Sequence, residues 1–171
     1  MKETGVVRRI DELGRIVIPK EIRNRLKVSP GDMLDIYTDK DMITLKKYSI
    51  LDDFSLSLIP VVEALKNDKI DFIISTRQEV LISTLNLDSG LELSKDFLKM
   101  FFKSEDLELA PSKVLELANG FIPNRYILGR KIFKDGDIVG YIIMLGRDSF
   151  MRLDKELFQI LTKYINNYIT S

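Results

Sequence analysis

Short apolar runs broken by turn residues characterise the first part of the chain. Residues 6–10 and 16–18 are rich in β-branched side chains, which favour an extended backbone, so we expect a short strand in each. Gly14 allows a tight chain reversal between these strands and leaves the next residue at an exposed tip. Pro19 suits the first turn of a helix, and the sequence after it predicts a helix of about two turns over residues 19–27.

A second pair of strands is expected before residue 48. Residues 33–38 alternate between apolar and polar side chains, with Leu34 and Ile36 on one face. A hairpin connection follows, and Ile43 and Leu45 continue the inward face on the next strand. A β-rich unit of roughly fifty residues buries too little apolar surface to be comfortably stable alone. We therefore expect this unit to fold together with a second copy of the chain.

The pattern changes to longer elements after a junction at residues 49–53. Pro60 lies within a run of helical spacing, where it either kinks one helix or opens a second helix as its first residue. We expect a single kinked helix that connects the two halves of the chain. Its apolar positions are Phe54, Leu58, Val61 or Val62, and Leu65.

Strand and helix patterns alternate along the next part of the chain. Two strand-like segments, 70–75 and 80–85, precede a helix that Ser94 is placed to cap and whose phenylalanines face inward. Residues 107–117 fit more than one period, so they predict no single element.

A strong hairpin signal occupies residues 125–145. The segments 125–133 and 138–145 flank Asp135-Gly136-Asp137, which is typical of a tight hairpin turn. The second arm is apolar on both faces, so we expect a central strand that is covered on each side.

The last predicted element is a long helix that follows Asp154. A 3–4 spacing links Leu153, Leu157, Ile160 and Tyr164, and this seam could pack two dimers together or cover the helix's own sheet, which is the commoner outcome. The order of helices and strands in this half predicts an α+β fold. The apolar residues expected on one side of the helix are Leu157, Ile160, Leu161, Tyr164 and Tyr168.

Charge is distributed unevenly, although the 26 basic and 26 acidic residues of the chain balance. Eleven basic and eight acidic side chains give residues 1–50 a net charge of +3, and the remainder carries −3. The arginines of the first half cluster between Arg8 and Arg25. This arrangement is typical of a nucleic-acid module joined to another domain.

The composition argues against several classes of function. Cysteine and histidine are absent, which removes the usual zinc ligands, cysteine nucleophiles and histidine bases. Asp11 and Glu12 would need a pocket to act as a catalytic pair, and we expect them instead to hold Arg15 and its turn in shape. We expect no enzyme, cofactor or metal. With no apolar run of ~20 residues and no signal peptide, we expect a cytoplasmic protein away from membranes.

Three stretches of the first half form a distinctive combination: Gly5-Val6-Val7-Arg8-Arg9-Ile10, the segment from Asp11 to Arg25, and Pro30-Gly31-Asp32. Together they closely resemble the AbrB/SpoVT family of DNA-binding transition-state regulators, almost without a gap from Met1 to about Tyr48. The resemblance implies that residues 1–50 build a swapped-hairpin, DNA-binding homodimer. For residues 51–171 it implies a connecting helix and a GAF-like sensor or oligomerisation domain, through which dimers can join into a homotetramer.

The resemblance also implies that the protein binds double-stranded DNA, with loose sequence preference, to control sporulation or transition-state genes. Family arginines at the positions of Arg8, Arg15 and Arg23 carry DNA binding. Arginine suits this role because its planar, always charged fork bonds a phosphate or a guanine edge in a bidentate manner. The further candidates are Arg9, Asn24, Arg25 and Lys2, of which Asn24 stands where family members often have a second arginine.

Two alternatives stay open at this point. The same N-terminal fold serves antitoxins that repress their own operons, but these usually carry a short extended tail that folds on a toxin, whereas residues 54–171 indicate a globular domain. Six aromatic residues of that domain could line a cavity for a small-molecule ligand, although such residues more often form an ordinary core. They are Phe72, Phe97, Phe101, Phe102, Phe133 and Tyr141.

Overall fold

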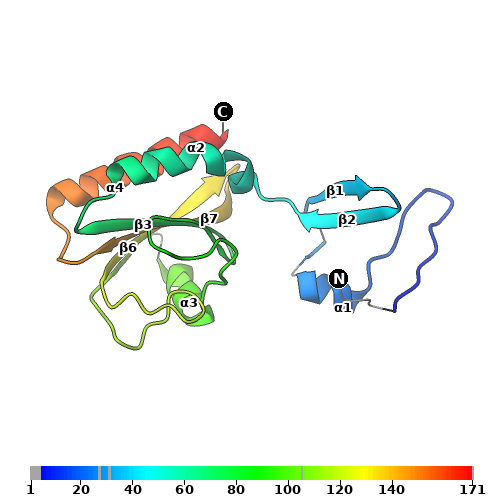
Figure 1. The fold of residues 1–171 in the computed structure, drawn as a ribbon, viewed down its shortest axis with the longest axis horizontal. Helices are drawn as coiled ribbons and strands as arrows, with labels where there is room; N and C mark the ends of the chain where they lie inside the picture. Colours follow the sequence, from blue (N-terminus) through cyan, green and yellow to red (C-terminus); the bar gives the residue numbers. More distant parts are fainter. Residues whose placement is uncertain (1–4, 27, 31, 105, 171) are drawn as a thin grey trace. The chain divides into compact units, whose positions relative to one another are not determined.

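The structure is a computed structural model that describes residues 5–26, 28–30, 32–104 and 106–170. The chain divides into two compact units, Met1–Tyr48 and Ser49–Ser171, which we call the N-terminal and C-terminal units (Figure 1). Lys2, Lys27, Gly31 and the side chain of Phe102 lie outside the described part.

The N-terminal unit contains one helix and one hairpin. Helix α1 (Lys20–Leu26) begins directly after Pro19, and strands β1 (Leu34–Asp39) and β2 (Met42–Lys47) pair in antiparallel fashion. Lys40 adopts a positive φ of 48° in the connection, as a tight hairpin turn requires. The helix and hairpin expected from the sequence are confirmed.

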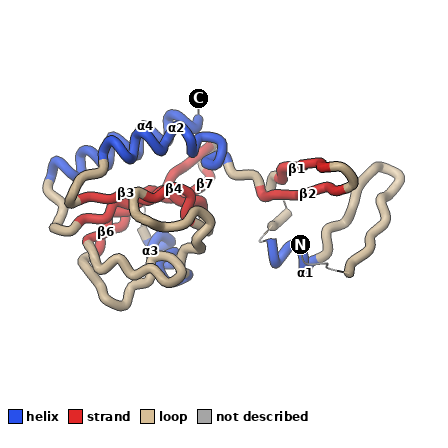
Figure 2. The backbone as a smooth tube through the Cα atoms, in the orientation of Figure 1, coloured by secondary structure: helices blue, strands red, loops and turns tan. Residues whose placement is uncertain are grey.

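The two strands expected earlier in this unit are absent from the single chain. Residues 6–10 and 16–18 form a loop instead, drawn in tan in Figure 2. Two backbone hydrogen bonds close the turn of this loop, in which Asp11 N donates to Arg15 O and Gly14 N donates to Asp11 O. β-Branched residues favour an extended backbone, but a strand also needs a neighbouring strand to complete its ladder. The prediction of strands here was therefore wrong for one isolated chain.

The expected inward face of the β1–β2 hairpin is apolar but uncovered. Ile36 is 67% exposed and Ile43 is 71% exposed, whereas Leu34 and Leu45 are only half-buried. The loop adds exposed apolar residues, including Val7 at 85%. A single chain therefore leaves the apolar side of its N-terminal unit in contact with solvent.

The C-terminal unit is a five-stranded antiparallel sheet with helices on both faces (Figure 1). The strand order is β4-β3-β7-β6-β5. One buried cluster lies under α2 and α4, and a second lies on the side of α3. The elements are α2 (Ile50–Leu65), β3 (Ile70–Thr76), β4 (Val80–Ser83), α3 (Lys95–Lys103), β5 (Asp106–Leu109), β6 (Tyr126–Lys134), β7 (Asp137–Gly146) and α4 (Arg152–Thr170).

The predicted central strand is confirmed as β7. Ile142 belongs to the first buried cluster and Ile143 to the second, so both faces of the strand are covered. The turn before it has positive φ angles of 52° at Asp135 and 87° at Gly136, as its composition predicted. The N-cap of α3 is also confirmed, since the Ser94 hydroxyl accepts a hydrogen bond from Phe97 N at 3.1 Å.

Helices α2 and α4 differ from expectation in how they pack. The expected single helix through Pro60 is confirmed as α2, but this helix is also a layer of the C-terminal unit, because Leu58 and Val62 are buried against the sheet. Helix α4 begins at Arg152, before Asp154, and its solvent side carries Ile160. Its apolar residues lie around more than one side, so their spacing alone did not identify the packed face. The buried residues of α4 are Phe158, Leu161, Thr162, Ile165 and Ile169.

The aromatic residues expected around one cavity lie on opposite faces of the sheet. Phe72 belongs to the cluster under α2 and α4, whereas Phe97, Phe101 and Tyr141 belong to the other. The Phe101 and Tyr141 rings stack with centroids 4.4 Å apart, and burial raises the pKa of Tyr141. These residues fill a core. Phe72 is therefore separated by the sheet from Phe97, Phe101 and Tyr141, and these four do not enclose a common ligand site.

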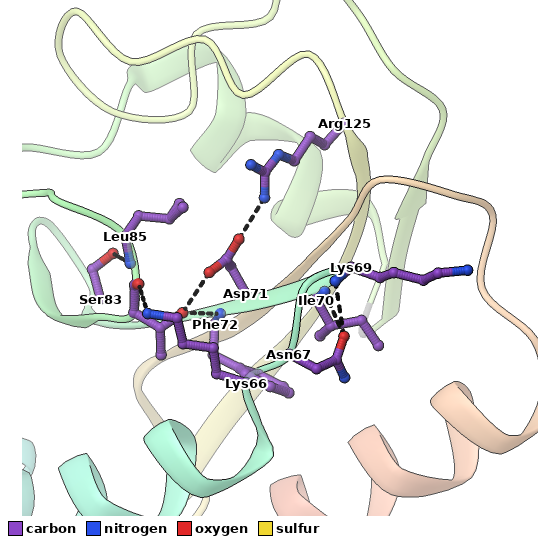
Figure 3. Close-up of polar contacts among 10 residues, drawn as sticks. Lys66, Asn67, Lys69, Ile70, Asp71, Phe72, Ser83, Leu85 and Arg125 are labelled. Carbon is purple, nitrogen blue, oxygen red and sulfur yellow. Dashed lines mark hydrogen bonds and ion pairs between the residues drawn. The ribbon is translucent and has the colours of Figure 1, made fainter.

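A polar network fastens one end of the sheet (Figure 3). Asp71 accepts a hydrogen bond from the Thr84 hydroxyl at 3.1 Å and pairs with Arg125 Nη1 at 2.5 Å. The same hydroxyl accepts from Phe72 N, and Lys66 Nζ donates to Thr84 O at 2.9 Å. The nearly buried carboxylate of Asp71 is thus satisfied internally, which favours a structural role for this network.

Candidate nucleic-acid interface

The turn between residues 11 and 15 is held by the carboxylate of Asp11. Oδ1 accepts hydrogen bonds from Leu13 N at 3.0 Å and Arg15 N at 2.8 Å, and Oδ2 accepts from Arg15 Nε at 2.8 Å. Gly14 supplies the positive φ of 75° that the reversal needs. The turn is therefore stabilised by residues within five positions of one another and positions Arg15 locally.

The electrostatics of the turn follow from these contacts. Hydrogen bonds from the backbone and then from the side chain of Arg15 hold the pKa of Asp11 below its ordinary value. The carboxylate is ionised at neutral pH, and the pair remains open to solvent, with 71% of the Arg15 side chain exposed. Such a guanidinium keeps a full charge at the tip of a loop, where a phosphate or a base edge can approach it.

The other candidates in the loop and on α1 have different surroundings. Arg8 is exposed, and its Nη1 donates to Val7 O at 3.0 Å. Arg23 is half-buried and its Nη1 donates to Ile18 O at 2.7 Å, so it ties α1 to the end of the loop. This contact brings the two candidate segments together. The exposed candidates without a described side-chain contact are Arg9, Asn24 and Arg25.

Lys20 was not predicted from the sequence as a candidate, although it is basic and exposed at the first position of α1, beside Pro19. Its place directly between the loop and the basic helix was the signal that could have identified it.

The described parts of both units contain no cluster of three or more His, Cys, Asp or Glu residues that could hold a metal ion. None of the described helices is both long and apolar enough to cross a bilayer.

A second candidate surface lies on the solvent side of α2 and α4, which lie side by side (Figure 1). Leu153 is 75% exposed and Ile160 is 65% exposed on α4, and Leu56 protrudes from α2. We call this the helical face and define it by Leu56, Ile59, Leu153, Ile160 and Tyr164. Isolated exposed apolar residues are normal, but several on neighbouring helices make the helical face a candidate contact surface.

Comparison with known proteins covers both units. The model of the family described as "Antidote-toxin recognition MazE, bacterial antitoxin" matches residues 7–51. Stage V sporulation protein T of Bacillus subtilis (strain 168) is 33% identical over 158 residues, which span 88% of each chain. The Transition state regulatory protein AbrB of the same organism is 56% identical over 48 residues, or 28% of this chain and 50% of that one.

Two solved structures are similar to parts of this chain. The solution structure of the N-terminal DNA recognition domain of AbrB from Bacillus subtilis is 55% identical, with a TM-score of 0.26, over 29% of this chain and 92% of that one. The GAF domain of a two-component sensor histidine kinase from Bacillus halodurans has a TM-score of 0.50 at 15% identity, over 70% of this chain and 92% of that one. At that identity the second likeness shows a fold, and the GAF-like α+β prediction is confirmed.

Proposed function

Because the chain belongs to the AbrB/SpoVT family of transcription regulators, we propose that it binds duplex DNA through the arginines of its N-terminal unit and controls sporulation or transition-state genes. The observation that carries this proposal is the 33% identity with Stage V sporulation protein T along 88% of both chains. The AbrB domain that is 55% identical over 29% of this chain is described as a DNA recognition domain. Residues 51–171 serve as the sensor and assembly domain.

The proposed binding surface consists of Arg8, Arg15 and Arg23, with the further candidates beside them. Exposed guanidinium groups neutralise phosphates, and this neutralisation supplies much of the affinity of a DNA-binding protein. Asp11 already bonds Arg15 and two backbone amides, so it does not form a catalytic pair with Glu12. We propose no enzymatic activity for this site.

A homodimer is proposed for the N-terminal unit. The uncovered apolar residues of the hairpin and loop, Ile36 and Val7 among them, need a partner of matching shape. Residues 6–10 and 16–18 have no strand neighbour among the described residues of their own chain, and a second chain would supply one. In an intertwined dimer three arginine positions become six, arranged about a two-fold axis. A loosely sequence-dependent interaction with flexible DNA follows from contacts made mainly to the backbone.

The salt dependence of DNA binding tests this function. Six neutralised phosphates per dimer predict that affinity falls about a thousandfold between about 50 and 200 mM salt. The measurement is a titration of the full chain against a fluorescent duplex at several salt concentrations. A scrambled duplex of equal length should bind within about tenfold of the first, because phosphate contacts carry no sequence information. Affinity that does not change with salt contradicts the proposal.

We also propose that two dimers join through the helical face. The Ile160→Glu variant should then change the parent tetramer to a dimer, because two like charges would be buried at the seam. Multi-angle light scattering of the full chain measures this change. Gln159→Glu adds the same charge at the neighbouring exposed position, away from the apolar stripe, and should remain a tetramer. A parent protein that stays dimeric at all concentrations contradicts the seam.

An antitoxin is the second candidate function, favoured by the family description matched by residues 7–51. Toxin-binding tails are usually short and extended before they meet their partner. Residues from Ser49 onward instead form a folded unit with two buried clusters. The regulator therefore agrees better with the whole chain.

A further inference from the structure

Arg15 differs from an ordinary exposed arginine because the carboxylate that it bonds, that of Asp11, is itself held in place by other hydrogen bonds. Exposed ion pairs usually contribute little, since two flexible side chains must be ordered to form one contact. Here the carboxylate of Asp11 is already fixed by the backbone amides of Leu13 and Arg15, at 3.0 and 2.8 Å. The guanidinium therefore meets an anchor whose position the turn has determined.

The contact uses only one edge of the guanidinium. Asp11 Oδ2 accepts from Nε at 2.8 Å, and neither Nη atom of Arg15 has a hydrogen-bond partner among the described residues. The plane of the group is thereby oriented, while the terminal pair of nitrogens stays available. Those two nitrogens form one of the bidentate edges that a phosphate or a guanine can occupy.

We propose that Asp11 is a positioning residue for DNA binding, whose carboxylate holds Arg15 by Nε so that its two Nη groups point toward the duplex. This inference rests on the proposed function. A free arginine side chain loses rotamer freedom when it binds, and a side chain that is already ordered loses less. Because less conformational entropy is lost on binding, the affinity for DNA is higher.

A positioning role of Asp11 and a purely electrostatic effect of its charge predict opposite changes in DNA affinity when the carboxylate is removed. Asp11 carries a negative charge close to the proposed phosphate contact, so its loss should strengthen binding if charge alone mattered. If Asp11 orients Arg15, its loss should weaken binding even though the protein becomes more basic. The sign of the change therefore separates the two explanations.

Asp11→Asn is the informative substitution. Asparagine keeps an oxygen that can accept from the amides of Leu13 and Arg15, so the turn is retained. Its NH₂ group cannot accept a hydrogen bond from Arg15 Nε. Glu12→Gln is the matched control, because Glu12 is exposed, adjacent in sequence and without a hydrogen bond or ion pair to a described residue.

The experiment is a double-mutant cycle on duplex binding by the full chain, with each affinity measured at several salt concentrations. We expect Asp11→Asn to weaken binding about fivefold and Glu12→Gln to leave it equal or tighter. In an Arg15→Gln background, Asp11→Asn should no longer weaken binding. The salt dependence of Asp11→Asn should match that of the parent, because Arg15 still carries its charge.

Each contrary result has a distinct meaning. If Asp11→Asn binds as tightly as the parent while Arg15→Gln binds weakly, the positioning role is wrong and the proposed function stands. If Asp11→Asn weakens binding equally in the Arg15→Gln background, its effect does not act through Arg15 and the inference is again wrong. If Arg15→Gln binds like the parent, the inference is overturned together with the DNA-contact role of the loop.

Discussion

Replacement of Arg15 by alanine should lower the affinity of the full chain for duplex DNA by at least about a hundredfold. A hydrogen bond to a charged group contributes about 1.5–3 kcal/mol, and a symmetric dimer loses two such contacts at once. The fold should be unaffected, because the side chain is 71% exposed and the hydrogen bonds from the backbone amides of residues 13 and 15 to Asp11 Oδ1 do not involve it. Fluorescence anisotropy at several salt concentrations measures the change, and the logarithmic salt slope should become shallower by about two units.

Lys40→Asn is the control for this variant. It removes one positive charge from the same unit, at the exposed β1–β2 connection, and asparagine tolerates the positive φ of 48° found there. Its effect on affinity should stay within a fewfold change. Equal affinities for Arg15→Ala and the parent protein would remove the loop from the binding surface.

Ile36→Asp should abolish DNA binding by preventing the N-terminal units from pairing. Ile36 is 67% exposed in the single chain, so a charge at this position should not destabilise the fold unless a second chain covers it. In the proposed dimer an unpaired carboxylate would be buried in each copy, and each would cost several kcal/mol. We expect at least a thousandfold weaker binding. In the Ile160→Glu background, light scattering should report a monomer.

Thr44→Asp provides the matched comparison for Ile36→Asp. Thr44 pairs with Tyr37 across the hairpin, so it lies on the opposite side of the β1–β2 ribbon from Ile36. The added charge is the same and the position is also exposed. Thr44→Asp should keep the parent assembly and bind DNA. If both variants behave alike, the apolar side of the hairpin is not a subunit interface.

Local sequence signals predicted several elements well. Pro19 marked the start of α1, and Asp135-Gly136-Asp137 marked the turn between β6 and β7. Ser94 was recognised as a helix cap because its hydroxyl acts within three residues. These features depend on backbone preferences and on contacts between near neighbours in sequence, so the residues themselves carry the information.

The errors occurred where a distant partner decides the outcome. Residues 6–10 and 16–18 have strand-forming side chains, yet no strand lies beside them in the part of the chain that the structure describes. Phe72 and Phe97 are both apolar and aromatic, but they lie in different layers because the sheet separates them. No local pattern distinguishes these situations.

The sequence by itself determined the family, the two-part arrangement of apolar patterns, the central position of β7 and the identity of the basic candidates. The sequence also predicted that Asp11 holds Arg15, as their hydrogen bond confirms. Only the tertiary structure decided that Phe158 and Ile165 are packed while Ile160 faces solvent, and that Asp11 bonds Arg15 through Nε. The physical reason is that spacing along a chain states which side chains share a face. It does not state which neighbour covers that face, because burial is a property of the assembled layers.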